Sequence, residues 1–355
     1  MMVRQLALFF VLIFAVRNAA AQSAVSLPPD PSTLVPVTDS IARSTPMPHS
    51  PADILELASA MNGLDVPSTK PWHVKLTWDE FDEDGDNVHS GTLEEFYVNP
   101  RKYRRTYTGD TLNQTDVATE SGLYRDGDQR WPGPVELQVR SEVLQPLSLA
   151  LRDQRNIRLD KIDWRVGASK LPCVVLRRTD MTVSDNGLQK FCFDPGTVLL
   201  RYIKGRGWDE TTCNNFVLFQ DRYVPVDVEV TQAGKAFLKI HVEEVEPIAQ
   251  AADSLFNPPT GSKGPIAGRI SLPSATFGDY VLSRAISAFP RGVHGRVTVN
   301  IVVGKDGRVI QAEAVDGPAE LRAAAVEAIR KYQFRPFLVL DQPVEVESSF
   351  FFEIH

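Results

Sequence analysis

The stretch GRVTVNIVVGKDGRVIQAEAVDGPAELRAAAVEAIRKYQFRPF, residues 295–337, decides the fold of the C-terminal part of the chain. Apolar and polar side chains alternate over residues 297–303, which is the period of a half-buried strand. Lys305-Asp306-Gly307 then predicts a hairpin turn, in which Gly307 is free to adopt a positive φ. Residues 308–315 follow as the return strand. The stretch therefore opens with two antiparallel strands.

The same stretch continues into an amphipathic helix. Pro318 suits its first position, where the missing N–H of proline costs nothing. An apolar stripe would pack on the sheet, and small alanines let the helix lie close to it. The stripe consists of Leu321, Ala324, Ala325, Ala328 and Ile329. A second helix is expected upstream, over residues 279–289, from the helical spacing of its apolar residues.

The chain ends in a further strand pattern. Between residues 344 and 354 one set of side chains is mostly apolar and the alternate set is mostly acidic, which predicts a strand with one face on the core. The two faces carry Val344, Val346, Ser348, Phe350, Phe352 and Ile354 and, opposite them, Glu345, Glu347, Ser349, Phe351 and Glu353.

Taken together, these segments resemble the C-terminal domain of the TonB energy-transducer family. The family's aromatic-proline pair is matched by Phe289-Pro290, its G-x-V-x-V strand by residues 295–299 and its turn by Asp306-Gly307. Its leucine- and alanine-rich helix, which ends in an aromatic R/P segment, is matched by residues 321–336. The resemblance covers residues 265–355 and implies a small domain of antiparallel strands and two helices.

In that family the domain binds an extended segment of an outer-membrane receptor at a sheet edge, so the resemblance implies a binding protein and not an enzyme. Main-chain hydrogen bonds supply the affinity and alternate side chains supply the specificity. The candidate edge consists of Val344, Glu345, Val346, Glu347, Ser348, Ser349 and Phe350. Glu345 and Glu347 would be outward contacts, or else charges that protect an exposed edge. A homodimer through the same edge is a further alternative.

The N-terminus is typical of a secretory signal peptide, predicted over residues 1–21. Arg4 precedes an apolar run, Leu6–Val16, and small residues lead to a cleavage site before Gln22. The run is shorter than the about 20 residues that span a membrane. We expect a periplasmic protein, and retention of the segment as an inner-membrane anchor is the alternative. The long Pro-Glu/Pro-Lys spacer of the transducers is missing, which disfavours energy transduction.

The remaining sequence divides into a linker, a domain and a second linker. Residues 22–50 are rich in Pro, Ser and Thr and predict a disordered linker. The domain, residues 51–249, combines many strand patterns with two helical ones, at 52–62 and 134–153. Strand patterns lie at residues 72–81, 91–98, 102–109, 112–127, 161–166, 173–181, 189–194, 197–205, 215–224, 225–232 and 235–247. The second linker, residues 250–268, separates this domain from the C-terminal domain, residues 269–355.

Residues 54–247 resemble the LolA/LolB-like lipoprotein carriers of the bacterial envelope, in strand order, in the mid-segment helix and in EEFYVNPRKYRRTY, residues 94–107. The resemblance implies a curved antiparallel sheet, or half-barrel, with a helix in its mouth, so that the chain as a whole is α+β. It also implies a lipid or lipoprotein ligand. The alternative is an antiparallel β domain without a ligand. The tryptophans are expected in the β core, where some could line an apolar pocket.

Cys173, Cys192 and Cys213 are the cysteines of the chain. An exported protein is free to form disulfides. Cys173 and Cys192 lie in neighbouring strand patterns, which favours them as the pair and leaves Cys213 over. The chain has no C-x-x-C motif, so neither a zinc site nor thioredoxin-type chemistry is supported.

Composition and motifs exclude several functions. The net charge is −7, so no basic face for nucleic acid is implied. We find no motif for a catalytic residue, a metal site or a cofactor. Two hypotheses remain. The first is an exported TonB-like protein that docks an envelope partner by strand addition, as in TonB-dependent transport across the outer membrane. The second is a periplasmic carrier or sensor of lipid or lipoprotein that binds through the N-terminal β domain.

Overall fold

The structure is a computed structural model. It describes residues 34–37, 44–64, 69–147, 157–179, 188–205, 209–248, 253–262, 264–266, 268–272, 277, 280–283, 289–290 and 292–354. The predicted signal peptide, residues 1–21, and most of the predicted first linker lie outside these residues. Among the described helices, none has the length and apolar character that crossing a membrane requires.

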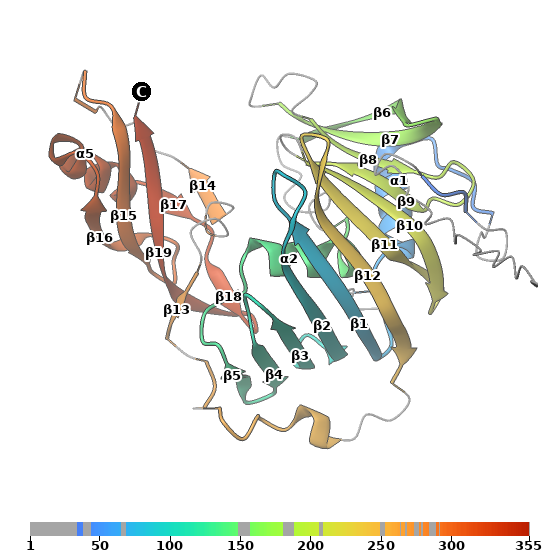
Figure 1. The fold of residues 1–355 in the computed structure, drawn as a ribbon, viewed down its shortest axis with the longest axis horizontal. Coiled ribbons are helices and arrows are strands. Elements are labelled where there is room, and N and C mark those ends of the chain that lie inside the picture. The colour runs from blue at the N-terminus through green and yellow to red at the C-terminus, as the bar shows by residue number, and fades with distance from the viewer. Residues whose placement is uncertain are drawn as a thin grey trace, which may run out of the picture. The chain divides into compact units, whose positions relative to one another are not determined.

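One large antiparallel sheet contains twelve strands, in the order β5-β4-β3-β2-β1-β12-β11-β10-β9-β8-β7-β6 (Figure 1). Strands adjacent in sequence pair as neighbours in two series, β1–β5 and β6–β12, and the pairing of β1 with β12 joins the series. The sheet is open, since β5 and β6 end it, which confirms the predicted curved sheet. The strands are β1 (Trp72–Phe81), β2 (Asn87–Asn99), β3 (Lys102–Gly109), β4 (Gln114–Thr119), β5 (Gly122–Gly127), β6 (Ile157–Val166), β7 (Ser169–Arg178), β8 (Gln189–Phe193), β9 (Leu200–Lys204), β10 (Asp209–Phe219), β11 (Arg222–Gln232) and β12 (Lys235–Pro247).

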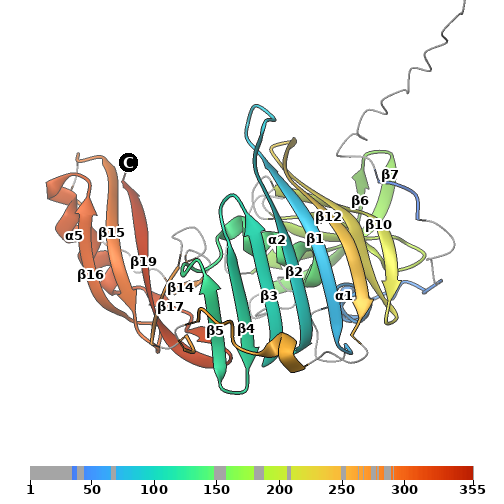
Figure 2. The same cartoon turned by 60° about the horizontal axis from the view of Figure 1, so that its bottom comes forward.

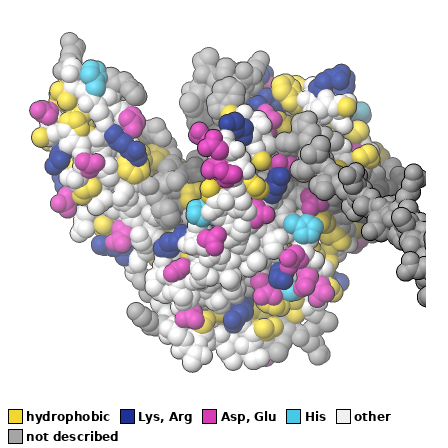
Figure 3. Space-filling view, in the orientation of Figure 1, with side chains coloured by type: hydrophobic (Ala, Val, Ile, Leu, Met, Phe, Trp, Pro, Cys, Tyr) yellow, Lys and Arg dark blue, Asp and Glu magenta, His cyan; other side chains and the backbone are white. Residues whose placement is uncertain are grey.

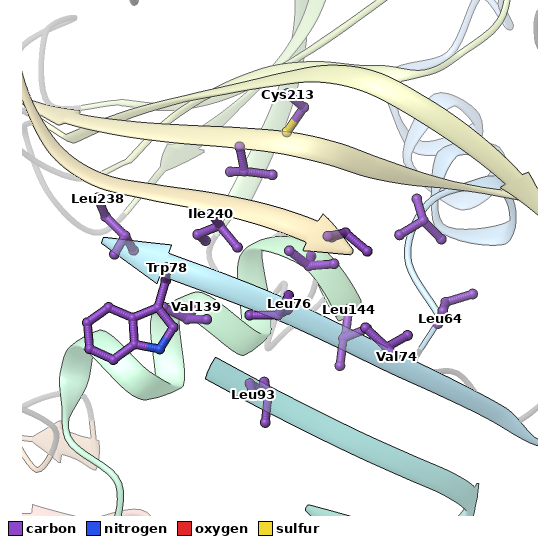
Figure 4. Packing of buried hydrophobic residues seen from close by; sticks show 14 of the residues in the cluster. Leu64, Val74, Leu76, Trp78, Leu93, Val139, Leu144, Cys213, Leu238 and Ile240 are labelled. Carbon is purple, nitrogen blue, oxygen red and sulfur yellow. The ribbon is translucent and has the colours of Figure 1, made fainter. Parts of the chain in front are cut away.

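Helix α2 (Pro134–Leu144) lies in the connection from β5 to β6, the two ends of the sheet. It packs against the sheet behind β2 and β3 in the view of Figure 2. Its buried Val139 and Leu144 meet Leu76 and Leu93 from the strands (Figure 4). The helix is shorter than the predicted 134–153, because the residue before a proline disfavours helical geometry and Pro146 follows Gln145.

Helix α1 (Pro51–Met61) confirms the helix predicted at residues 52–62. Ser50 caps it, since its hydroxyl accepts a hydrogen bond from the Asp53 N–H. Its buried Ile54 and Leu55 join a core cluster with strands β7, β8 and β9.

Between β10 and β11 the chain turns at Gln220 and Asp221, with φ of 50° and 62°. The prediction of one strand over residues 215–224 was therefore wrong. Glycine most often supplies two successive positive φ angles in a hairpin turn, and here neither residue is glycine. The pattern on both sides is apolar, so it continues through the turn without a break.

A second, five-stranded sheet has the order β13-β19-β15-β16, with β18 also paired to β19, and β14 pairs separately with β17. Helix α5 buries the predicted stripe, including Leu321, Ala325 and Ile329, against β15 and β16. The elements are β13 (Arg269–Ser271), β14 (Val281–Ser283), β15 (Gly295–Val303), β16 (Val309–Asp316), α5 (Ala319–Arg330), β17 (Gln333–Phe334), β18 (Phe337–Val339) and β19 (Gln342–Ile354), and η2 (Asp253–Phe256) precedes them as a short 3-10 turn.

Gly307 adopts the positive φ that the sequence predicted, at 81°. A Cβ at this position would lie 2.0 Å from the carbonyl oxygen of Phe334. Only glycine therefore allows the β15–β16 turn to lie against β17.

Two expectations for the C-terminal sheet were wrong. Residues 281–283 form strand β14 and not part of a helix over 279–289, because Val281 pairs with Phe334 of β17. The sheet is also not wholly antiparallel, since β13 runs parallel to β19. Both strands have three residues, too few to show a strand period in the sequence.

The predicted disulfide is present. Cys173 of β7 lies opposite Cys192 of β8 in the ladder, and the two are bonded. Cys213 of β10 is buried and free.

Removing this disulfide is expected to destabilise the protein. The bond joins residues 19 apart in sequence, and closing a loop of this size in the unfolded chain contributes about 3 kcal/mol. We expect Cys173→Ala with Cys192→Ala to lower the free energy of unfolding in urea by about 2–4 kcal/mol. The difference should vanish when the parent protein is measured under reducing conditions, and a difference that persists there would attribute the loss to packing.

Candidate partner-binding edge

Strand β19 pairs with β15 on one side along almost its whole length. The ladder runs from Gly295 opposite Ile354 to Val303 opposite Val346. This pairing satisfies the main-chain groups that β19 directs toward the interior of the sheet. Partner binding by strand addition therefore concerns the other side of β19.

On that other side β19 has two parts. β13 pairs with Glu345–Glu347, and the hydroxyl of Ser348 donates to the carbonyl of Leu272 at 2.9 Å. From Ser349 to Ile354 no described strand pairs with this side. We call Glu345–Ser348 the covered part of β19 and Ser349–Ile354 the open part.

The direction of the main-chain groups in the open part follows from the covered part. The N–H of Glu345 donates to Gly268 at 2.9 Å, and the carbonyl of Glu347 accepts from Leu272 at 3.0 Å, both toward β13. Main-chain groups alternate in direction along a strand. Those of Ser349, Phe351 and Glu353 therefore face away from β15.

The candidate edge residues occupy different positions on β19. Val344 lies in the hairpin with β18, where it pairs with Phe337. Residues 345–348 form the covered part, and Ser349 and Phe350 begin the open part. The structure thus narrows the predicted edge, and sequence reasoning missed the residues that cover it, since Arg-Ile-Ser-Leu at 269–272 alternates too briefly to predict a strand.

The inner face of β19 is held by aromatic rings. The ring of Phe350 lies 5.3 Å from that of Phe352, and Tyr332 lies 5.5 Å from Phe350, edge to face. Phe289 adds a contact to Phe352 at 5.8 Å. Such pairs each contribute about 0.5–1.5 kcal/mol beyond the area they bury. The open part is therefore anchored to the core although one of its edges is unpaired.

The outer face of the same strand carries polar and charged contacts. Arg269 bonds the Glu345 carboxylate through Nε and Nη2, at 3.1 and 3.0 Å. The Arg296 guanidinium lies 4.0 Å from the ring centroid of Phe351, a cation–π contact. A groove over this face is lined by residues of β13, β15, β16 and β19. Glu345, which the sequence predicted either as an outward contact or as a charge that protects an exposed edge, has Arg269 as a partner within the chain.

The face of the large sheet that α2 covers is a second candidate site, and a row of buried charges crosses it. Glu95, Arg105, Asp116 and Arg125 lie opposite one another on β2, β3, β4 and β5. Arg140 of α2 joins them, and its Nε donates to Glu95 at 2.8 Å. The signs alternate along the row, so each carboxylate bonds a guanidinium.

Glu95 is the centre of this row, because its fully buried carboxylate binds two arginines. Burial alone would raise its pKa, and the guanidinium groups of Arg105 and Arg140 overcome this and lower the pKa to about 2. The paired charges connect α2 to β2 and β3. Sequence reasoning missed this network, since charged residues in a strand pattern are usually solvent-exposed.

Other buried polar groups on the face that α2 covers have weaker hydrogen-bond partners or none among the described residues. Burial raises the pKa of Glu142 of α2 to about 7, although Gln138 and Thr211 donate hydrogen bonds to it. The indole nitrogens of Trp72 and Trp78 and the hydroxyl of Tyr107 have no hydrogen-bond partner among the described residues. These donors lie in or beside the apolar cluster that α2 completes.

Charges of both signs are scattered over the face seen in Figure 3, and acidic side chains gather at the tip of the β1–β2 hairpin. Asp82 there accepts hydrogen bonds from the N–H groups of Asp84 and Asp86, as in an ordinary turn. In the described part of the chain no group of three or more His, Cys, Asp or Glu side chains could hold a metal ion.

The C-terminal sheet and α5 define a small α+β module with a last strand that is open on one side. Residues 287–354 match the family model described as Gram-negative bacterial TonB protein C-terminal. The match confirms the resemblance inferred from Phe289-Pro290, the β15–β16 hairpin and α5.

Solved structures similar to the chain include a LolA superfamily protein from Nitrosomonas europaea, with 11% identity and a TM-score of 0.39 over 59% of this chain and 98% of that one. A putative outer membrane lipoprotein-sorting protein domain from Vibrio parahaemolyticus has 10% identity and a TM-score of 0.37, over 58% and 95%. A DUF1329 family protein from Desulfovibrio piger has 11% identity and a TM-score of 0.39, over 60% and 98%. The curated proteins give no match to the chain.

Breaking the buried charge row should be costly. Glu95→Gln leaves two buried guanidinium groups without their carboxylate, and we expect a loss of about 3–5 kcal/mol in the free energy of unfolding at pH 7. Because the pKa of Glu95 is lowered to about 2, its contribution is present above the pKa of an unfolded glutamate and is lost as the pH falls toward 2. The difference between parent and variant should therefore shrink in acid.

Glu94→Gln is the matched control, since Glu94 is the adjacent residue and its side chain is 41% exposed. We expect it to change the free energy of unfolding by less than about 1 kcal/mol. Urea titrations at pH 7 and pH 3 measure both variants. Equal losses for Glu95→Gln and Glu94→Gln would mean that the buried row does not hold α2 on the sheet.

Proposed function

We propose that the protein is an exported, periplasmic binding protein whose C-terminal module docks an envelope protein by strand addition at β19. An outer-membrane receptor is the proposed partner, and TonB-dependent transport is the proposed setting. No catalytic step is assigned to the protein. The observation that carries the proposal is the open part of β19, Ser349–Ile354, within a module that matches the TonB C-terminal family.

The chemistry of this edge supports such docking. Ser349, Phe351 and Glu353 direct main-chain donors and acceptors outward, where an extended segment can pair with them. Phe351 is 39% exposed beside this edge and offers an apolar contact. The aromatic contacts of Phe350 and Phe352 hold the strand in place before a partner arrives, which lowers the entropic cost of binding.

The proposed location rests on the N-terminal sequence. A short basic segment, an apolar run and small residues before Gln22 are typical of a signal for export. The disulfide between Cys173 and Cys192 agrees with an oxidising compartment. The alternative of an uncleaved inner-membrane anchor would place the same domains on the periplasmic side.

A second candidate function is carriage or sensing of an amphiphile by the large sheet. The observation that favours it is the set of buried donors without partners, on Trp72, Trp78 and Tyr107, beside the apolar cluster under α2. A lipid that entered beneath α2 would offer apolar surface to the cluster and ester oxygens to these donors. Such a ligand requires α2 to move and the Glu95–Arg140 contact to open.

Photocrosslinking tests the docking proposal. A photoreactive phenylalanine analogue replaces Phe351 in the full chain. The variant is expressed in the native host cells, so that crosslinking takes place with the host's own envelope proteins. We expect a covalent adduct with an envelope protein. Ser349→Pro should abolish it, because proline removes an outward N–H, while the bonds of β19 to β15 stay in place.

Ser349→Ala is the control, since it also loses the side-chain hydrogen bond to Asn300 and keeps the N–H. Its adduct should persist. Equal adducts with Ser349→Pro and Ser349→Ala would mean that the partner binds without pairing to the strand, and that the docking proposal is wrong.

Lipid analysis tests the second candidate. The full chain is purified without detergent and extracted for mass spectrometry. A carrier should yield one lipid class in an amount close to that of the protein, and Glu95→Gln, which frees α2, should change this amount. A yield far below the molar amount of protein in both forms would contradict a carrier role.

A further inference from the structure

The chain itself already performs strand addition on β19. β13 pairs in parallel with β19, and Arg269 lies 76 residues before its partner Glu345. Parallel strands cannot be joined by a tight turn, so β13 reaches this position as a strand from a distant part of the sequence. Among the described strands, only β19 pairs with it.

The main-chain contacts of β13 are those that a strand from another protein would make. The N–H of Glu345 donates to Gly268, and the N–H of Leu272 donates to Glu347. Together with the bond from Ser348 to Leu272 they close the covered part of β19. Any partner that extends beyond the open part must replace these bonds.

The side chains of β13 show what the edge selects. Ile270 and Leu272 are 7% and 3% exposed and belong to the C-terminal core cluster, so the covered part offers two apolar sites at alternate positions. Arg269 faces the other way and bonds Glu345 twice. Ser271, between Ile270 and Leu272, is exposed, so its position does not require an apolar or a charged side chain.

The attachment of β13 is compatible with exchange. Gly268, at φ 82°, lets the chain turn into the strand, and no atom lies close to where its Cβ would be. Each hydrogen bond contributes only about 0.5–1.5 kcal/mol net. The strand is also tethered to the module, which gives it a high effective concentration at β19.

We propose that β13 is an internal ligand of β19, and that the external partner is an extended segment that runs parallel to β19 and displaces it. The partner carries the pattern of residues 269–272: a basic residue, an aliphatic one, a small polar one and an aliphatic one. Glu345 binds the basic residue of the partner, and the apolar sites that Ile270 and Leu272 now occupy bind its aliphatic residues. The inference rests on the proposed function in taking β19 as the docking strand.

A peptide of residues 264–273 with a fluorescent label tests the inference, and fluorescence anisotropy measures its binding to the full chain. Ile270→Asp with Leu272→Asp should release β13, because two carboxylates cannot stay in apolar sites. We expect this variant to bind the peptide at least about tenfold more tightly than the parent, which has its own strand as competitor. Ser271→Asp is the matched control and should bind like the parent.

A charge exchange tests the role of Glu345. A peptide with Arg269→Glu should lose binding to the released chain and regain it when the chain carries Glu345→Arg. A peptide of the same composition in reversed order should not bind. Circular dichroism confirms that the released chain is folded; a folded chain that binds no better than the parent, or binds the reversed peptide equally, overturns the inference.

A second variant tests the inference without releasing β13 by substitution of its buried residues. Ser271 and Glu347 are exposed and lie opposite each other in the ladder, so Ser271→Cys with Glu347→Cys can form a disulfide that locks β13 in place. Reduction of this disulfide should increase peptide binding. Equal binding to the oxidised and the reduced variant, or no binding to either, overturns the inference. If the peptide binds as expected but the Phe351 adduct is absent, the envelope partner is wrong and the internal ligand stands.

Discussion

A strand at the edge of a sheet carries unpaired N–H and C=O groups, and both sheets of this protein are arranged around that constraint. In the C-terminal sheet β13 covers part of β19 and leaves Ser349–Ile354 open. In the large sheet the long central strands are all paired, and the short β5 and the β6 hairpin end it. Among the described strands β6 and β16 are also paired on one side only, whereas β19 is paired on both sides at Glu345–Glu347 and on one side beyond. The open part of β19 attracts a functional interpretation because it lies in the module that matches the TonB C-terminal family.

In the large sheet, one connection has to cross the face of the sheet. β5 and β6 follow each other in sequence but lie at opposite ends, so the chain between them must pass across the sheet, and α2 lies in that connection. Apolar contacts of Val139 and Leu144 and the charge contact of Arg140 with Glu95 both hold the helix. Removing one partner of these buried ion pairs would leave a buried charge uncompensated, which costs more free energy than the intact pairs gain.

Much of the fold could be predicted because its residues repeat with a clear period. The alternation of residues 297–303 and 344–354 gave β15 and β19, and Gly307 gave the turn after β15. β13 could not be predicted, since three residues show no period and its pairing joins residues far apart in sequence. The turn at Gln220 was missed because it lacks glycine, and the helix expected at 279–289 failed because pairing with β17 overrides local spacing. The buried charges near Glu95 were hidden because strand periods do not distinguish a paired interior charge from a solvated one.

The joining of β1 to β12 has a consequence for how the chain folds. Each hairpin series consists of neighbours in sequence, whereas Trp72 must find Pro247 across the whole domain. Contacts between distant residues form slowly, because the loop-closure entropy is lost before the contacts repay it. We therefore expect two hairpin arrays to form early and to meet late, with β1 and β12 exposed in the interval. Because unpaired strand edges can template aggregation, this interval is the period of greatest risk for the folding chain, and the middle of the sheet is the part that most needs chaperone protection.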